Sequence, residues 1–356
     1  MSAIELPTLL EAREPPEAQG RERDSVRLLV ADRASGSITH ERFADLPHFL
    51  APGDLVVVNT SSTLAAALPV SRADGQELEL RLSTPAEGKD DERFWIVELR
   101  CGDAPFGSVE TGERFVLPGG ASAEILAPYA GVRLWLALLD LPCPVAAYLD
   151  RHGSPIRYGY VPRPWPISAY QNVYAVEPGS AEMPSAGRPF TTELITRLVA
   201  GGVLVAPIVL HTGVSSQERH ERPYPERYRV PEATARLVNA VHSWGGRVIA
   251  TGTTVVRALE TVAGHDGVVS AGEGWTNLVV TPERGVRAVD GLITGLHELE
   301  SSHLDLLRAI GGECLIVESY NAALEHGYRW HEFGDSQLLL GGARSGSGTP
   351  RSALSD

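Results

Sequence analysis

The stretch from Thr251 to Arg257 carries the residues best suited to bind an anionic or polar group. Thr251, Gly252, Thr253 and Thr254 follow an apolar run and lead into a helical pattern that carries Arg257. A turn of small residues at the start of a helix leaves backbone N–H groups free, and the helix dipole favours negative charge there. We therefore expect a carboxylate or phosphate to bind at this turn. A second interpretation stays open, in which the threonines cap the helix and Arg257 pairs with a surface acid.

Two histidines end apolar runs that are typical of buried strands. His211 comes directly after the run Leu204–Leu210, and His297 ends the run VDGLITGLH. Open α/β sheets bind ligands at the carboxyl ends of their strands, and imidazole exchanges protons near neutral pH. Both positions therefore suit a functional histidine. A purely structural alternative also stays open, in which each histidine lies at the edge of the core and is hydrogen-bonded to the backbone.

Residue type and spacing argue against several kinds of site. A zinc-binding HExxH pattern from His297 would need a second histidine at position 301, where the sequence has serine. The three cysteines form no CxxC pair, which argues against a disulfide framework and a cysteine zinc site. Lys89 is the sole lysine and lies in the polar run PAEGKDDE, which excludes Schiff-base chemistry and a phosphate-loop lysine. We therefore expect no metal site.

The composition bounds the partners of the protein. The chain has 356 residues and a formal net charge of −14, which disfavours general nucleic-acid binding but allows a local basic patch that docks a structured RNA. No apolar run approaches the ~20 residues of a membrane helix, and no signal segment begins the chain. We expect a cytoplasmic protein without membrane association. The sequence does not indicate an oligomeric state.

Helical and parallel-strand patterns alternate through most of the chain. Residues 190–262 contain two helix-then-strand units and a third helix, and the runs Leu204–Leu210 and Arg247–Ala250 are typical of strands buried on both faces. The pattern changes between Leu64 and Leu141, where segments such as Glu77–Leu82 alternate with period two and no helical pattern interrupts them. This predicts a small antiparallel barrel or sandwich inserted into an α/β main domain.

These changes in pattern set the predicted boundaries. The main domain comprises residues 1–63 and 142–340, and the inserted β domain comprises residues 64–141. Residues 341–356 are rich in Gly, Ser, Arg and Pro and are predicted to be a disordered tail. The connection Pro142–Pro189 contains many aromatic residues, so we expect it to be ordered and functional.

Several motifs resemble a known enzyme family. The segments PFTTELITRLVAGGV, LHTG, VPEATARLVNA and GGRVIATGTTVVRALET match the S-adenosylmethionine:tRNA ribosyltransferase-isomerases of the queuosine pathway. Further matches are PGDLVVVN near Asn59, YQNVYA, VDGLITGLH and FGD. They occur in the family's order across nearly the whole chain. The GTTxVRxLE segment is the most specific of them.

The resemblance implies a β-barrel inserted into a larger α/β domain. It also implies transfer and isomerisation of the ribosyl part of S-adenosylmethionine onto a 7-aminomethyl-7-deazaguanine base in tRNA, giving epoxyqueuosine and releasing adenine and methionine. S-adenosylmethionine would be a co-substrate, and no cofactor would be bound permanently. The implied substrate contacts are Asn59, His211, Gly213, Thr251, Gly252, Thr253, Thr254, Arg257, Thr294 and His297.

The implied chemistry assigns roles to three of these residues. A general base must remove a proton beside the sulfonium, and imidazole with its pKa near ~6.5 suits that step. We expect His211 to be the base, with His297 as the second candidate. Arg257 would hold the methionine carboxylate.

The chain departs from the family at several polar motifs. After Asn59 the family has Asp-Thr-Arg and a further arginine, where this chain has Thr60, Ser61, Ser62 and Ala67. The remaining departures are Ser215-Ser216-Gln217 in place of a run to Gly-Thr-Phe, Tyr224 and Pro189 in place of two histidines, and Glu298-Leu299-Glu300-Ser301 in place of Leu-Pro-Lys-Ser.

These departures leave two other functions open. One is a divergent paralogue that uses S-adenosylmethionine with a small-molecule acceptor, and the other is a non-catalytic protein that binds a nucleoside or RNA. Lost cations remove phosphate contacts, so we expect weaker tRNA binding than in a typical family member. The arginine-rich segment Gln217–Arg229 could supply new contacts, but its glutamates favour a solvated, salt-bridged loop.

Overall fold

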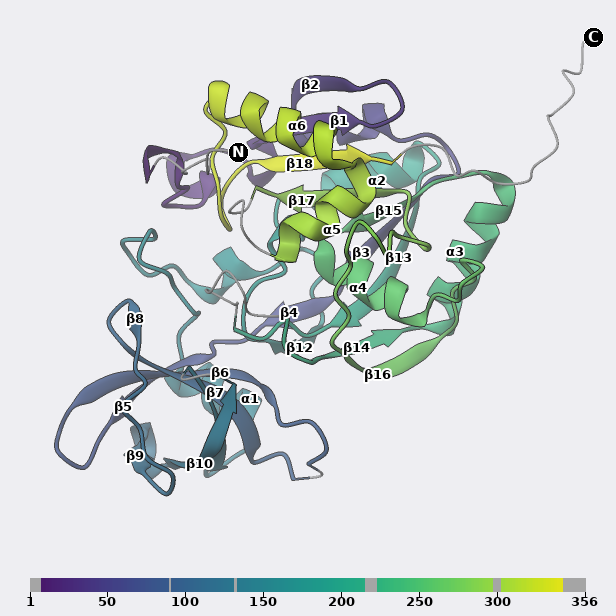
Figure 1. The fold of residues 1–356 in the computed structure, drawn as a ribbon. Helices are drawn as coiled ribbons and strands as arrows, with labels where there is room; N and C mark the ends of the chain where they lie inside the picture. Colours follow the sequence, from purple (N-terminus) through teal and green to yellow (C-terminus); the bar gives the residue numbers. More distant parts are fainter. Residues whose placement is uncertain (1–7, 90, 131–132, 215–222, 297–301, 342–356) are drawn as a thin grey trace, which may run out of the picture.

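The computed structural model describes residues 8–89, 91–130, 133–214, 223–296 and 302–341. It has the predicted architecture, an α/β main domain with an inserted antiparallel β-barrel. Figure 1 shows the large sheet with its helices above the smaller barrel, and the short strand β4 (Ser61–Thr63) leads from one to the other. No helix among these residues is long and apolar enough to cross a membrane.

A nine-stranded mixed sheet forms the centre of the main domain, in the order β16-β14-β13-β3-β15-β17-β18-β1-β2. Four neighbouring strands, β13, β3, β15 and β17, run parallel to one another, while β14, β18 and β2 run antiparallel to β13, β17 and β1. The strands are β1 (Arg27–Asp32), β2 (Ser37–Arg42), β3 (Leu55–Asn59), β13 (Leu204–Leu210), β14 (Glu226–Val230), β15 (Val248–Thr251), β16 (Gly272–Thr276), β17 (Gly291–Gly295) and β18 (Ser336–Leu340).

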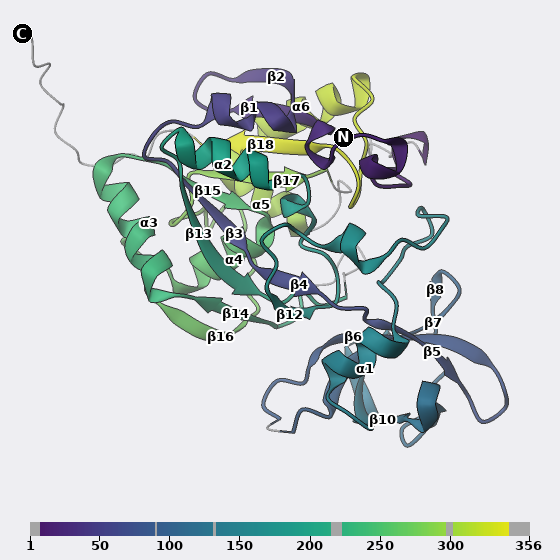
Figure 2. The same cartoon turned by 180° about the vertical axis from the view of Figure 1, so that it is seen from behind.

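Helices cover both faces of this sheet, as Figures 1 and 2 show from opposite sides. Alternate residues of a strand enter different cores: Leu55 and Val57 join one apolar cluster, and Val56 and Val58 join the other. Burial on both faces explains why the strands are continuous apolar runs. The helices are α2 (Thr192–Ala200) on one face and α3 (Glu232–Trp244), α4 (Thr253–Val262), α5 (Ser302–Gly311) and α6 (Glu313–Glu325) on the other.

Six antiparallel strands close into the predicted barrel, because β11 pairs with β7 as well as with β10. Period-two segments place one face of each strand in the barrel core, where Trp95 and Phe115 are buried. A two-residue strand, β8 (Ala104–Pro105), extends the edge at β7. The barrel strands are β5 (Ala67–Ser71), β6 (Glu77–Pro85), β7 (Phe94–Cys101), β9 (Arg114–Val116), β10 (Ser122–Ala130) and β11 (Leu134–Asp140).

The connection after the barrel is ordered and touches both parts of the molecule. Its helix α1 (Val145–His152) buries Tyr148 and Leu149 in the barrel core. Its strand β12 (Glu177–Ser180) pairs with β4 (Ser61–Thr63) beside the main sheet. Contacts therefore cross residue 141, and the domain boundaries at 64 and 141 stay a prediction.

One segment differs from the expected loop. Residues 226–230 form β14, which pairs with β13 and β16 at the edge of the large sheet. Tyr228 and Val230 are buried while Arg227 and Arg229 are exposed, and this alternation is typical of a strand with one face in the core and one in solvent. Arg229 forms an ion pair with Glu177, which lies outside the segment, at 2.5 Å, and residues 217–222 of the expected salt-bridged loop lie outside the described residues.

Candidate functional site

The predicted site residues converge on one edge of the large sheet. His211, Asn59, Thr251 and Thr294 lie at the carboxyl ends of the adjacent parallel strands β13, β3, β15 and β17. Neighbouring strands are about 4.8 Å apart, so these four ends occupy a row of roughly 15 Å. His297 falls outside the described residues. Parallel pairing thus brings together residues that lie far apart in the chain.

Asn59 connects the ends of two strands. Its Nδ2 donates to the carbonyl of Leu210 at 2.8 Å, and its Oδ1 accepts the N–H of Leu210 at 3.0 Å and that of Ser61 at 3.1 Å. The side chain is buried, so these bonds satisfy groups that water cannot reach. Asn59 therefore positions the residues that follow β3 and β13, including His211.

His211 is held by two serines that lie far from it in the chain. Its Nδ1 lies 2.8 Å from Ser61 Oγ, which lies 2.6 Å from Ser180 Oγ. The other ring nitrogen, Nε2, lies 3.8 Å from a carboxylate oxygen of Glu177. Gly179 makes room for the ring, because a Cβ there would lie 2.3 Å from Nδ1. The imidazole is thus fixed through Nδ1 and has Nε2 available for chemistry.

The surroundings keep His211 neutral near physiological pH. Burial lowers its pKa, the Glu177 carboxylate raises it, and the Arg227 and Arg229 charges lower it further. Burial is the largest of these effects, so the net shift is downward. A neutral imidazole can accept a proton, as a general base must.

The turn after β15 contains hydroxyls without partners. The side-chain oxygens of Thr251 and Thr254 are both buried and form no hydrogen bond. The first turn of α4 has no side-chain cap, and Gly252 has φ 90°. Buried polar atoms usually find a partner. This turn is therefore a place where a ligand could satisfy both the hydroxyls and the backbone N–H groups.

Arg257 is buried and paired, rather than free to meet a ligand at the helix start. It is the fifth residue of α4 and lies beyond the first turn of the helix. Its guanidinium forms an ion pair with Glu226 and donates to the carbonyls of Leu278 at 3.1 Å and Thr276 at 3.2 Å. The interpretation in which Arg257 pairs with an acid describes this geometry, except that the acid is largely buried. Its contact with the methionine carboxylate stays a prediction.

Glu226 also links this ion pair to the segment after His211. Its second carboxylate oxygen accepts the N–H of Gly213 at 3.2 Å. Gly213 packs against Ser83 of the barrel, where a Cβ would lie 2.7 Å from the hydroxyl oxygen. Thr294, the last predicted contact, is buried with its hydroxyl 3.3 Å from Nε2 of His303.

Sequence reasoning missed a group of carboxyl and aromatic side chains nearby. The Tyr158 hydroxyl donates to Glu182, and the Tyr160 hydroxyl donates to Glu332 at 2.6 Å. The ring of His331 stacks on that of Tyr160, with centroids 4.0 Å apart and planes at 12°. We call these five residues the Tyr–Glu cluster. The only sequence signal for it was the aromatic connection that was expected to be functional.

The Tyr–Glu cluster adjoins the row of strand ends at two points. The Thr212 hydroxyl, next to His211, donates to the carbonyl of Glu182 at 2.5 Å. The N–H of His331 donates to the carbonyl of Leu296, just beyond β17, at 3.3 Å. His331 has φ 74°, a left-handed conformation that non-glycine residues rarely adopt. Burial, with a smaller contribution from the Glu182 charge, raises the pKa of Glu332 to about 7 against the lowering effect of the bond from Tyr160.

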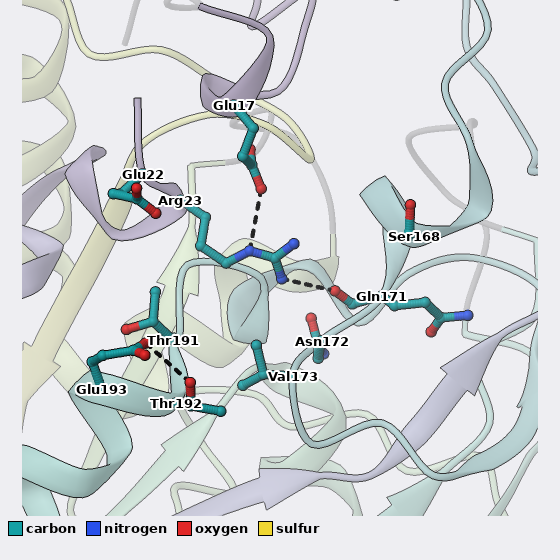
Figure 3. A pocket seen from close by; sticks show the side chains of 10 residues that line it. All are labelled: Glu17, Glu22, Arg23, Ser168, Gln171, Asn172, Val173, Thr191, Thr192 and Glu193. Atoms are coloured by element: carbon teal, nitrogen blue, oxygen red, sulfur yellow. Dashed lines mark hydrogen bonds and ion pairs between the residues drawn. The ribbon is translucent and has the colours of Figure 1, made fainter. Parts of the chain in front are cut away.

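A cavity of about 420 Å³ lies elsewhere, at the start of α2. In Figure 3, Arg23 lies across it, bonded to Glu17 at 3.2 Å and to the carbonyl of Gln171 at 3.0 Å. None of the predicted site residues lines it, although Gln171 belongs to the YQNVYA motif. Its acidic lining makes it a poor site for a nucleic-acid phosphate. In the part of the chain that the structure describes, no group of three or more His, Cys, Asp or Glu could hold a metal ion.

Comparison with known proteins gives one consistent result. Residues 3–339 match a family model described as queuosine biosynthesis protein. The S-adenosylmethionine:tRNA ribosyltransferase-isomerase of Moorella thermoacetica is 37% identical over 349 residues, which cover 94% of this chain and 98% of the relative. The protein of the same name from Rubrobacter xylanophilus is also 37% identical, covering 96% and 97%. The crystal structure of an S-adenosylmethionine tRNA ribosyltransferase from Thermotoga maritima is similar with a TM-score of 0.53 and 29% identity, covering 95% of this chain and 99% of that one.

Proposed function

This chain belongs to the queuosine biosynthesis protein family, and from that premise we propose that it is an S-adenosylmethionine:tRNA ribosyltransferase-isomerase. The relatives of that name match it at 33–37% identity across nearly their whole length. The observation that carries the proposal is the row of His211, Asn59, Thr251 and Thr294 on neighbouring strand ends. No observation favours the paralogue with a small acceptor or the non-catalytic binder.

We infer that S-adenosylmethionine binds at the turn between β15 and α4. Two partnerless hydroxyls, those of Thr251 and Thr254, lie there beside the positive end of a ten-residue helix. The methionine carboxylate suits the helix dipole and the N–H groups. Arg257 contributes by holding Glu226, and through it Gly213, in position.

His211 serves as the general base in this proposal. It takes up at Nε2 the proton from the carbon beside the sulfonium, and Nδ1–H then donates to Ser61, whose own proton points to Ser180. The distances of 2.8 and 2.6 Å along this chain allow that direction. Glu177, with an oxygen 3.8 Å from Nε2, stabilises the imidazolium that forms. His297, the second candidate for the general base, lies outside the described residues and is given no role in this proposal.

The acceptor in this proposal is the 7-aminomethyl-7-deazaguanine base of a precursor tRNA. The net charge of −14 and the loss of cations at Ser62 and Ala67 favour weaker tRNA binding than in a typical family member. Such binding would still suffice for turnover, since affinity for the ground state and rate of the chemical step are separate quantities.

Adenine release tests the proposal directly. The protein is incubated with S-adenosylmethionine and with precursor tRNA, unmodified tRNA or no tRNA, and free adenine and the modified base are measured. We expect both products only with precursor tRNA, and a large loss of both in His211→Gln. Adenine release without any tRNA acceptor would favour the paralogue, and binding without adenine release would favour the non-catalytic protein.

A further inference from the structure

The Tyr–Glu cluster contains two carboxylates, which are hydrogen-bond acceptors. Glu332 accepts a hydrogen bond at Oε2 from the Tyr160 hydroxyl at 2.6 Å, and its carboxylate also interacts with its own backbone N–H. A carboxylate offers about four lone-pair sites. Glu182, bonded to Tyr158, contributes a second negative charge close enough to raise the pKa of Glu332. A donor-rich, cationic group would therefore suit the cluster.

A separate observation points to a ligand at the same place. The Tyr170 hydroxyl is buried without a hydrogen-bond partner, and the residue is 3% exposed. Burial raises the pKa of Tyr170 to about 12, and the Glu332 charge adds to the rise, which places this hydroxyl within electrostatic reach of Glu332. Its ring packs on Phe333, the neighbour of Glu332, at 5.3 Å between centroids. Such an orphaned hydroxyl can donate to a carbonyl of a bound molecule.

The aromatic rings of the cluster suit a flat heterocycle. Tyr158 and Tyr160 are stacked at 5.9 Å with planes at 18°, and Tyr160 continues the stack to His331. Proteins that act on one base of a nucleic acid extrude it, stack it on aromatic side chains and read its Watson–Crick edge by hydrogen bonds. The cluster therefore combines stacked aromatic rings with carboxylate acceptors, the two kinds of group that such recognition uses.

We propose that the Tyr–Glu cluster is the subsite for the guanine-type acceptor base of the proposed reaction, with Glu332 accepting from its ring N–H and exocyclic amino group. The inference rests on the proposed function. The Tyr170 hydroxyl donates to the base carbonyl beside that edge. The combined charge of Glu332 and Glu182 attracts the aminomethyl group, which is an ammonium ion at neutral pH. Adenine fits poorly, because it presents no ring N–H on this edge.

The position of the cluster is consistent with transfer to such a base. It reaches the His211 segment through Thr212 and the end of β17 through Leu296. A base held there would lie beside the row of strand ends, where S-adenosylmethionine is proposed to bind. The two substrates would then approach each other from neighbouring parts of one edge.

Calorimetry with the free base 7-aminomethyl-7-deazaguanine tests the subsite without requiring turnover. We expect Glu332→Gln to weaken binding about 10- to 100-fold, the range for losing hydrogen bonds to a charged group. The affinity for S-adenosylmethionine should stay within about twofold, because that site lies elsewhere on the edge. Glu41→Gln, an identical change on the exposed outer strand β2, is the control and should bind like the wild type.

A base analogue without the exocyclic amino group sharpens the test. The wild type should bind it about tenfold or more weakly than the complete base, since a site built to bond an amino group leaves its acceptor unpaired without it. Glu332→Gln should lose most of this discrimination. Tyr160→Phe keeps the carboxylate but removes the group that holds it, so it should weaken base binding less; it also carries the test if Glu332→Gln does not fold.

The outcomes separate this inference from the proposed function. Base binding that depends on Glu332, in a protein that releases no adenine with precursor tRNA, would support the subsite and refute the enzyme assignment. Equal binding of the base by wild type and Glu332→Gln would overturn the subsite, whatever the activity. An equal loss of S-adenosylmethionine binding in a folded Glu332→Gln protein would also overturn it and place the co-substrate at the cluster.

Discussion

Ser61 Oγ lies 2.8 Å from Nδ1 of His211, although the two residues are 150 positions apart in the chain. The contact forms because β3 and β13 are parallel neighbours whose carboxyl ends meet at one edge. Ser61 stands where the family resemblance showed a departure from Asp-Thr-Arg. The structure makes it the residue that orients the proposed base.

Ser61→Ala should reduce the turnover of S-adenosylmethionine while leaving its binding nearly unchanged. Loss of one neutral hydrogen bond, about 0.5–1.5 kcal/mol, corresponds to a rate reduction of about 2- to 13-fold if the bond orients the base in the transition state. Steady-state adenine release and calorimetry measure the two effects. Ser62→Ala is the matched control, because the adjacent serine of β4 points to the opposite face. Equal rates for both variants would contradict the orienting role.

Thr251→Val should stabilise the free protein and weaken S-adenosylmethionine binding. The valine has the same shape and removes a buried hydroxyl that has no partner, which favours the folded state by about 1 kcal/mol. If the hydroxyl bonds the ligand, affinity falls by a similar amount. Thr234→Val, whose hydroxyl donates to the Pro207 carbonyl at 2.6 Å, should instead destabilise the protein. Thermal melts without ligand measure the change in stability, and melts with S-adenosylmethionine measure the change in affinity. Equal stabilisation of the two variants by the ligand would refute the contact with Thr251.

Arg257→Ala should lower stability more than it lowers ligand affinity. The change leaves Glu226 with an unpaired, largely buried charge, and breaking such a pair costs about 3–5 kcal/mol. The double variant Arg257→Ala/Glu226→Gln should recover part of that loss, which urea unfolding would detect. A direct contact with the methionine carboxylate predicts something else: affinity reduced by about 1.5–3 kcal/mol in both variants. Calorimetry on the double variant therefore decides between positioning and direct binding.

The stability of the protein should depend on pH through two adjacent groups with opposite signs. The pKa of Glu332 is about 7 in the fold against about 4.3 in an unfolded chain, so the folded state holds an extra proton and stability falls as pH rises through this range. The pKa of His331 is about 4 in the fold against about 6.5 when unfolded, so its contribution to stability rises with pH over that range.

Glu332→Gln separates the two contributions. In the wild type, the fall in stability due to Glu332 and the rise due to His331 should partly cancel between about pH 4.3 and 6.5. The variant should keep only the rise due to His331, with a difference from the wild type on the order of 4 kcal/mol at most. Urea midpoints measured from pH 4.5 to 8 test this, and Glu41→Gln should follow the wild-type profile. Parallel profiles for wild type and Glu332→Gln would show that Glu332 titrates normally in the fold.

Binding of precursor tRNA should be weaker and less salt-dependent than in a family member that keeps the arginines and lysine missing here. Each phosphate contact contributes a slope of about −0.9 to the logarithmic dependence of affinity on salt. Filter binding at two salt concentrations measures the slope, and Ser62→Arg, which restores one cation, should steepen it by about one unit. Tight binding by the wild-type protein with a steep slope would show that other residues replace the lost contacts.

The sequence by itself determined the architecture, because the signals for it are local. Continuous apolar runs such as Leu204–Leu210 are stable only where both faces of a strand are buried, which predicts a parallel sheet covered by helices. The alternation in Glu77–Leu82 is stable only with one face buried, which predicts the barrel. Once the parallel sheet is predicted, His211 and Thr251 must lie at its carboxyl edge.

Only the tertiary structure decided which side chains meet at that edge. His211 is oriented by Ser61, which contacts Ser180 in turn. Nothing in the sequence around either serine marks it as a partner, and strand pairing brings them together. Arg257, which appeared free for a ligand, meets Glu226 because residues 226–230 form a strand of the large sheet rather than a loop. The contacts of the Tyr–Glu cluster, between residues 158, 160, 182, 331 and 332, are encoded by no periodicity. Hydrogen bonds and ion pairs between distant segments follow from the packing of whole elements, so their partners emerge only when the chain is folded.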